Sequence, residues 1–157
     1  MSLLAKWLPV LCWMSLIFMA STNALSAGHT GAIIIPFLLR LFPHMSQRAL
    51  DWIHLGIRKT AHLVEYGILG LLLWRAIPEH RPSPEVADWW RAGVALLVAT
   101  FYGATDEFHQ SFVPSRGPSV HDVMIDACGA AIALTVTCLA NRGRPRRNAQ
   151  AAPSPAA

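Results

Sequence analysis

The sequence predicts an all-α fold, an integral membrane helical bundle with about four transmembrane helices and a short extracytoplasmic interfacial helix. The composition points to a membrane, because hydrophobic residues make up 54% of the 157 residues. Charged residues make up only 14%, whereas soluble domains contain roughly 25%. The mean hydropathy is also positive, at +0.38. These values disfavour a soluble enzyme.

Apolar stretches approach the length of about 20 residues that a membrane-spanning helix needs. They cover residues 3–20, 61–77, 90–108 and 120–140. The first is a transmembrane helix or, alternatively, a cleaved signal peptide, since Lys6 is followed by an apolar core and by small residues near Ala24. Cys12, Cys128 and Cys138 have no paired spacing, so they indicate neither a disulfide framework nor a metal site.

The segment between the first two apolar stretches predicts structure at the outer membrane surface. Residues 32–42 are apolar but too short to span, and we expect an interfacial or re-entrant piece. Ser46 is a plausible N-cap, and apolar residues follow it at helical spacing, which predicts a short amphipathic helix. The tail after Asn141 is basic and then rich in Ala and Pro, so we expect it to be disordered.

This organisation divides the chain into four parts. Residues 1–24 form the first transmembrane helix, 25–58 the extracytoplasmic connection, 59–140 a three-helix core and 141–157 a basic cytoplasmic tail.

The distribution of basic residues predicts the orientation. Eight of them fall on the side of the two termini and the loop near Arg81, and five on the other side. Because cytoplasmic segments carry the excess of Lys and Arg, we expect both termini in the cytoplasm and a location in the cell inner (plasma) membrane. The tail arginines account for the net charge of +4 and indicate a membrane surface and not nucleic acid.

Ionisable residues inside membrane spans are costly and mark functional sites. Five of the nine acidic residues lie in or at the ends of the last three spans, all at the predicted outer end, and we expect no comparable cluster at the cytoplasmic end. Helical spacing places these groups on shared faces, which predicts an outward-facing polar pocket. Its candidate residues are Lys59, His62, Glu65, Tyr66, Asp106, Glu107, Gln110, Arg116, Asp122 and Asp126.

Helix dipoles suggest one specific pair within this pocket. Lys59 lies at the N-terminus of its span and Asp106 near the C-terminus of the next, and each charge is unfavourable for its own helix. Antiparallel spans bring these two ends together, so we expect Lys59 and Asp106 to neutralise one another.

Structural explanations remain for some of these residues. Asp122 follows Ser119 as in a capping box, and Arg116 lies in a loop where solvent alone can stabilise it. The glycines Gly67, Gly70 and Gly129 are typical of close helix packing. His62, Glu65 and Asp126 are possible metal ligands, but no HExxH motif is present and Lys59 would oppose a dication, so no metal or other cofactor is expected.

Three motifs resemble those of a known family. They are Lys59-x-x-His62-x-x-x-Tyr66, Asp106-Glu107-x-x-Gln110 and Arg116-x-x-x-x-x-Asp122, and the similarity extends over residues 59–133. The combination is similar to the VanZ-like family of small bacterial membrane proteins associated with teicoplanin resistance. One departure is that Asp126 and Ala127 occupy the place where an Asn is expected before the glycine. The resemblance implies a context in the cell envelope and no particular reaction.

Three functions remain open from the sequence. The first is an envelope protein whose outer pocket binds a lipid head group, an antibiotic or a partner, contributing to glycopeptide resistance. The second is a membrane-embedded hydrolase or transferase acting on a lipid-linked envelope substrate, with His62 or His109 as acid or base, Asp106 or Glu107 as the orienting carboxylate, and Lys59 and Arg116 as anion-binding groups. The third, a transporter or proton relay, is disfavoured because the charges gather at one end.

Overall fold

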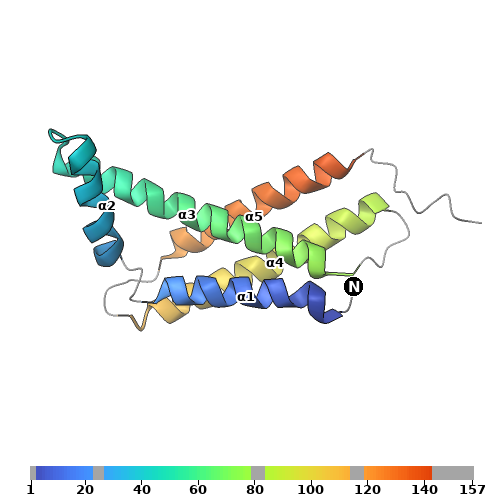
Figure 1. The fold of residues 1–157 in the computed structure, drawn as a ribbon. Coiled ribbons are helices and arrows are strands. Elements are labelled where there is room, and N and C mark those ends of the chain that lie inside the picture. Colours follow the sequence, from blue (N-terminus) through green and yellow to red (C-terminus); the bar gives the residue numbers. More distant parts are fainter. Residues whose placement is uncertain (1–2, 23–26, 79–83, 114–118, 143–157) are drawn as a thin grey trace, which may run out of the picture.

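The computed structural model describes residues 3–22, 27–78, 84–113 and 119–142, and in these ranges it contains five α-helices and no strand. They are α1 (Leu3–Ser21), α2 (Ala27–Leu41), α3 (Gln47–Ala76), α4 (Pro84–Gln110) and α5 (Val120–Asn141). Helices α1, α3, α4 and α5 lie lengthwise in one bundle, and α2 stands at its end against the start of α3 (Figure 1). The predicted all-helical class is confirmed.

Among the described residues, two helices combine the length and the apolarity needed to cross a membrane, α1 and α5. The sequence prediction counted four. Helices α3 and α4 are long enough, with 30 and 27 residues, but their polar and charged residues leave no stretch of either helix as apolar as those of α1 and α5. The difference arises because a hydropathy average counts a polar side chain wherever that side chain points.

Helix α3 joins two elements that the sequence analysis separates. Ser46 caps it as expected, and its Oγ accepts a hydrogen bond from the Ala49 N–H at 3.3 Å. The helix then continues without interruption to Ala76, so the expected short amphipathic helix is its first part. No proline lies between Ser46 and Ala76 to break the helix. The apolar segment 32–42 is helical up to Leu41, within α2, which continues through Pro36.

Small residues allow α3 and α5 to pack closely. A side chain at Gly70 would bring its Cβ within 3.3 Å of the Ala130 Cβ, and one at Gly129 would come within 2.9 Å of the Leu63 Cα. The structure therefore places these glycines at the closest approach of the two helices, as the sequence analysis expects. Around this crossing lies a core that includes Tyr66 and Leu69.

The helices run back and forth along the bundle, so each end of the bundle brings together the ends of several helices (Figure 1). The start of α1, the end of α3, the start of α4 and the end of α5 lie at one end of the bundle (Figure 1). The end of α1, the first half of α3, the end of α4 and the start of α5 lie at the other, which we call the site end. Most of the predicted site residues belong to that second group of segments, and His62, Glu65 and Tyr66 follow Lys59 within two turns of α3.

Candidate functional site

Polar side chains from three helices gather at the site end of the bundle. The exception among the predicted residues is Arg116, which falls outside the described residues. The carboxylates Asp106, Glu107 and Asp126 are buried, with 4%, 4% and 0% of their surfaces exposed, and Gln110 and Tyr66 are buried as well. The described site residues are Lys59, His62, Glu65 and Tyr66 on α3, Asp106, Glu107 and Gln110 on α4, and Asp122 and Asp126 on α5.

The deepest interaction of the site joins His62 and Asp126. The His62 Nδ1 lies 3.0 Å from the Asp126 Oδ1, and the Asp126 side chain is completely buried. A hydrogen bond between Nδ1–H and a carboxylate fixes the orientation of an imidazole ring and leaves Nε2 as its second polar atom. The sequence predicts Asp106 or Glu107 as the orienting carboxylate. For His62 that expectation is wrong, because Asp126 holds the ring.

Lys59 pairs with Asp122 and not with Asp106. The Lys59 Nζ donates to the Asp122 Oδ1, which joins α3 to α5. Lys59 has an acidic neighbour, as the helix dipoles predict, but the predicted partner, Asp106, follows from the antiparallel pair of α3 and α4 alone. Asp122 lies in the first turn of α5, which starts at the same end of the bundle, and it is the acid that Lys59 reaches.

The start of α5 is capped by its N-cap residue Ser119 and by Glu107 of α4. The Ser119 Oγ accepts a hydrogen bond from the Asp122 N–H at 3.3 Å, as the predicted N-cap requires. In a capping box the acid three residues later would accept from the N-cap N–H. Here the Glu107 Oε2 of α4 accepts that hydrogen bond at 2.8 Å. Asp122 is therefore left to pair with Lys59, and Glu107 ties the end of α4 to the start of α5.

Asp106 lies on the inner face of α4, one turn before the end of the helix. Its Oδ2 accepts a hydrogen bond from the Gln110 Nε2 at 2.9 Å. Its Oδ1 is buried and, among the described residues, has no hydrogen-bond partner; the same holds for the Tyr66 hydroxyl and the Asp126 Oδ2. Buried polar atoms are nearly always satisfied in native structures, so these atoms mark places where a water or ligand is expected.

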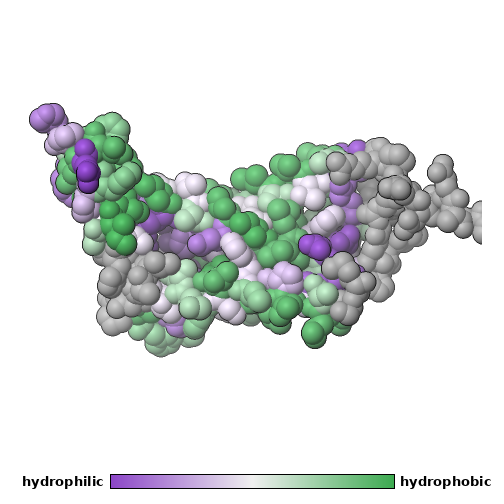
Figure 2. All heavy atoms as spheres, viewed as in Figure 1, coloured by the Kyte–Doolittle hydropathy of each residue, from purple (hydrophilic) through white to green (hydrophobic). Residues whose placement is uncertain are grey.

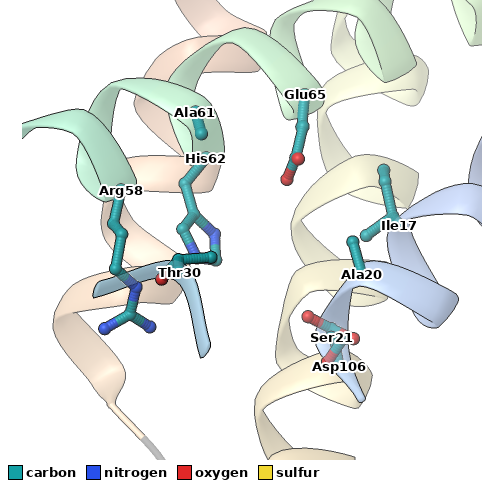
Figure 3. A pocket seen from close by; sticks show the side chains of 9 residues that line it. All are labelled: Ile17, Ala20, Ser21, Thr30, Arg58, Ala61, His62, Glu65 and Asp106. Carbon is teal, nitrogen blue, oxygen red and sulfur yellow. The ribbon is translucent and has the colours of Figure 1, made fainter. Parts of the chain in front are cut away.

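A cavity of about 120 Å³ opens beside these residues. Figure 3 shows side chains from four helices around it, with Arg58 on one side and Glu65 and Asp106 on the other. The cavity is lined by Ile17, Ala20 and Ser21 of α1, Thr30 of α2, Arg58, Ala61, His62 and Glu65 of α3, and Asp106 of α4.

The contribution of α1 and α2 to this cavity is not predicted from the sequence. Ser21 is buried, and within the described ranges its Oγ has no hydrogen-bond partner. Thr30 lines the wall contributed by α2, where its Oγ1 lies 3.0 Å from the His54 Nε2. A serine at the end of an apolar stretch carries no signal by itself, and only the packing of α1 against α3 reveals it. His109, the other predicted acid or base, lies against Phe18, with ring centroids 4.5 Å apart, and does not line the cavity.

A second buried polar cluster lies at the opposite end of the bundle, where none was expected. Asp88 and Arg91 are 5% and 8% exposed, and their charged groups are 3.6 Å apart. The Arg91 guanidinium donates to the Trp74 carbonyl and lies over the Trp74 ring, 4.2 Å from its centroid. The Asn141 Nδ2 donates to the Asp88 Oδ2. These contacts join α3, α4 and α5, so the cluster stabilises the bundle end by linking its helices.

No group of three His, Cys, Asp or Glu side chains suited to hold a metal ion occurs in the part of the chain that the structure describes. The described cysteines are free, with Cys12 and Cys128 exposed and Cys138 buried.

The fold and the site define an all-helical protein that carries many large apolar side chains on its surface and gathers acidic and basic residues inside one end of the bundle. Comparison with protein families identifies the group. The chain belongs to the VanZ/LLP1 family, whose model matches residues 6–141 and therefore extends beyond the motifs to α1 and α2. No curated protein and no solved structure matches the chain.

Proposed function

We propose that the protein is a multi-pass protein of the cell inner (plasma) membrane, in which α1, α3, α4 and α5 all span the bilayer. The distribution of side chains on α4 supports this proposal, because large apolar side chains are exposed and an acidic one is buried. Leu97 and Phe101 are 71% and 70% exposed, whereas Asp106 on the same helix is buried. A helix of this kind suits lipid outside and a polar interior inside. Figure 2 shows hydrophobic side chains over much of the viewed face, with hydrophilic ones in a recess where α2 meets the bundle.

In this arrangement the site end faces outward and both termini lie in the cytoplasm. The excess of basic residues at the terminal end supports this orientation, with eight against five. Helix α2 and the exposed first part of α3, where Trp52 is 67% exposed, would then lie at the outer membrane surface.

The pocket at the site end binds the polar head group of a membrane lipid or a lipid-linked envelope molecule. One observation carries this proposal: the Asp106 Oδ1 and the Ser21 Oγ belong to side chains that line the cavity and, among the described residues, neither has a partner. A cavity of about 120 Å³ is several times the 10–15 Å³ or so that a single water needs. A contribution to glycopeptide resistance, which the family resemblance implies, stays a prediction.

Filling the cavity tests the head-group proposal. Ala61 lines the cavity, so an Ala61→Trp variant should lose most of a lipid that co-purifies with the wild-type protein. The neighbouring Thr60 is exposed and is not part of the lining, which makes Thr60→Trp the matched control. Quantitative mass spectrometry of lipid per protein measures the effect. Equal retention by wild type, Ala61→Trp and Thr60→Trp would contradict the proposal.

The His62–Asp126 pair favours a second candidate function, a membrane-embedded enzyme acting on a lipid-linked envelope substrate. A carboxylate that orients a histidine beside a cavity is the arrangement of a general base. The same mass spectra separate the two functions. An enzyme lacking its base, as in His62→Asn, would retain a lipid of different mass from the one retained by wild type, whereas a binding protein would retain the same lipid.

A further inference from the structure

The charges around the cavity at the site end are unequal and separated. Two carboxylates, Glu65 and Asp106, face one guanidinium, that of Arg58. We propose that this pocket takes a zwitterionic head group with a primary ammonium, seating the ammonium at Asp106 and the adjoining phosphate at Arg58. This inference rests on the proposed function, that the pocket binds a head group, and it names the chemical class.

Asp106 is a buried carboxylate that faces the cavity. It is 4% exposed and lines the cavity, its Oδ2 is taken by Gln110, and its Oδ1 has no partner in the described part of the chain. A buried carboxylate oxygen that is left without a partner is destabilising. The group that best satisfies its remaining oxygen is a cationic N–H donor, because charge-assisted hydrogen bonds are the stronger kind.

Arg58 provides a cationic group in the lining of the cavity. Figure 3 shows its guanidinium on the side of the cavity away from Glu65 and Asp106. Within the described residues it forms no ion pair. Guanidinium groups bind phosphate oxygens in a bidentate manner. A ligand that carries a positive and a negative group a few atoms apart therefore matches both sides of the cavity.

Simpler head groups match the lining less well. A head group whose only charge is a phosphate would place no positive charge against Asp106 and Glu65 and would meet their repulsion. A quaternary ammonium carries the charge but has no N–H to donate to the Asp106 Oδ1. The Ser21 Oγ, also buried and without a partner among the described residues, provides one more polar contact for the ammonium.

Calorimetric titration of the full-length protein in detergent with short-chain lipids tests the inference. The three probes are dihexanoyl phosphatidylethanolamine, phosphatidylglycerol and phosphatidylcholine, which share the phosphate and differ in the rest of the head group. We expect the ethanolamine lipid to bind about tenfold more tightly than the other two, the effect of one charge-assisted hydrogen bond. Asp106→Asn should remove this preference. Asp51→Asn, which changes an exposed acid of α3 outside the cavity, should leave it intact.

Arg58→Gln provides an independent measurement. It should weaken binding of all three lipids by a similar factor and keep the preference for the ethanolamine lipid. The wild-type comparison and Arg58→Gln remain decisive even where Asp106→Asn fails to fold. Equal binding of the ethanolamine and glycerol lipids, or an unchanged preference in folded Asp106→Asn, would overturn the ammonium assignment alone. Absence of binding by all three lipids would overturn the head-group proposal as well.

Discussion

Replacing Gly129 with alanine should destabilise the bundle by about 1–3 kcal/mol, the usual range for overpacking a core. The added Cβ would lie 2.9 Å from both the Cα and the carbonyl carbon of Leu63 on α3. These are backbone atoms, so they cannot rotate away as the end of a flexible side chain can. Helices α3 and α5 must then separate at their crossing. The free energy of unfolding of the purified protein in detergent, measured by titration with a denaturing detergent, gives the effect.

Two other helical glycines provide matched controls. A Cβ at Gly56 on α3 or at Gly93 on α4 would meet no atom within 4 Å. Both alanine variants should be as stable as wild type, or up to about 1 kcal/mol more stable, because alanine is the better helix former. If Gly129→Ala unfolds at the same detergent concentration as these controls, the close crossing of α3 and α5 is wrong.

Removing His62 should have the second large effect. His62→Leu leaves the carboxyl group of Asp126 buried without the 3.0 Å contact that joins it to α3. The Asp126 Oδ2 already lacks a hydrogen-bond partner in the described ranges, so His62 is its main compensation. Breaking a buried pair from one side is typically destabilising by about 3–5 kcal/mol. The yield of folded protein in the membrane and its unfolding free energy both measure the loss.

The double variant His62→Leu/Asp126→Leu distinguishes pairing from simple loss of packing. Because it also removes the buried Asp126 carboxyl group, it should be more stable than His62→Leu alone, and the double-mutant cycle should show strong coupling. His121 is exposed on α5 and serves as the control, so His121→Leu should change stability little. Additive effects of the two single changes at His62 and Asp126 would show that the two residues do not interact.

Much of the fold could be predicted from the sequence, because apolar stretches and caps are local signals. The helices α1, α4 and α5 follow the predicted apolar stretches, and Ser46 and Ser119 cap α3 and α5 as expected. The continuity of α3 could not be predicted, because the change from a polar to an apolar surface along a helix leaves no break in the backbone. The span count differed because hydropathy averages do not record which face a residue occupies.

The residues that gather at the site end could be predicted better than the pairs they form. Helical spacing identified the inward faces of α3, α4 and α5, yet the pairs His62–Asp126 and Lys59–Asp122 depend on how α5 is set against α3. The hydrogen bond that the Ser119 N–H donates to the Glu107 Oε2 likewise depends on how α4 and α5 pack. The cluster of Asp88 and Arg91 was missed because each residue, read alone, resembles an ordinary charge near a loop. Tertiary packing determines all of these contacts.

The most direct test of the central claim, that the polar site lies at the outer face of a membrane-spanning bundle, is the labelling of single cysteines. Ser111 lies just beyond α4 at the site end, and Pro78 lies just beyond α3 at the other end, and both are exposed. In a background where Cys12, Cys128 and Cys138 are alanine, Ser111→Cys should react with a membrane-impermeant maleimide in spheroplasts. Pro78→Cys should react only after lysis. The reverse pattern, or labelling of both positions before lysis, would contradict the account.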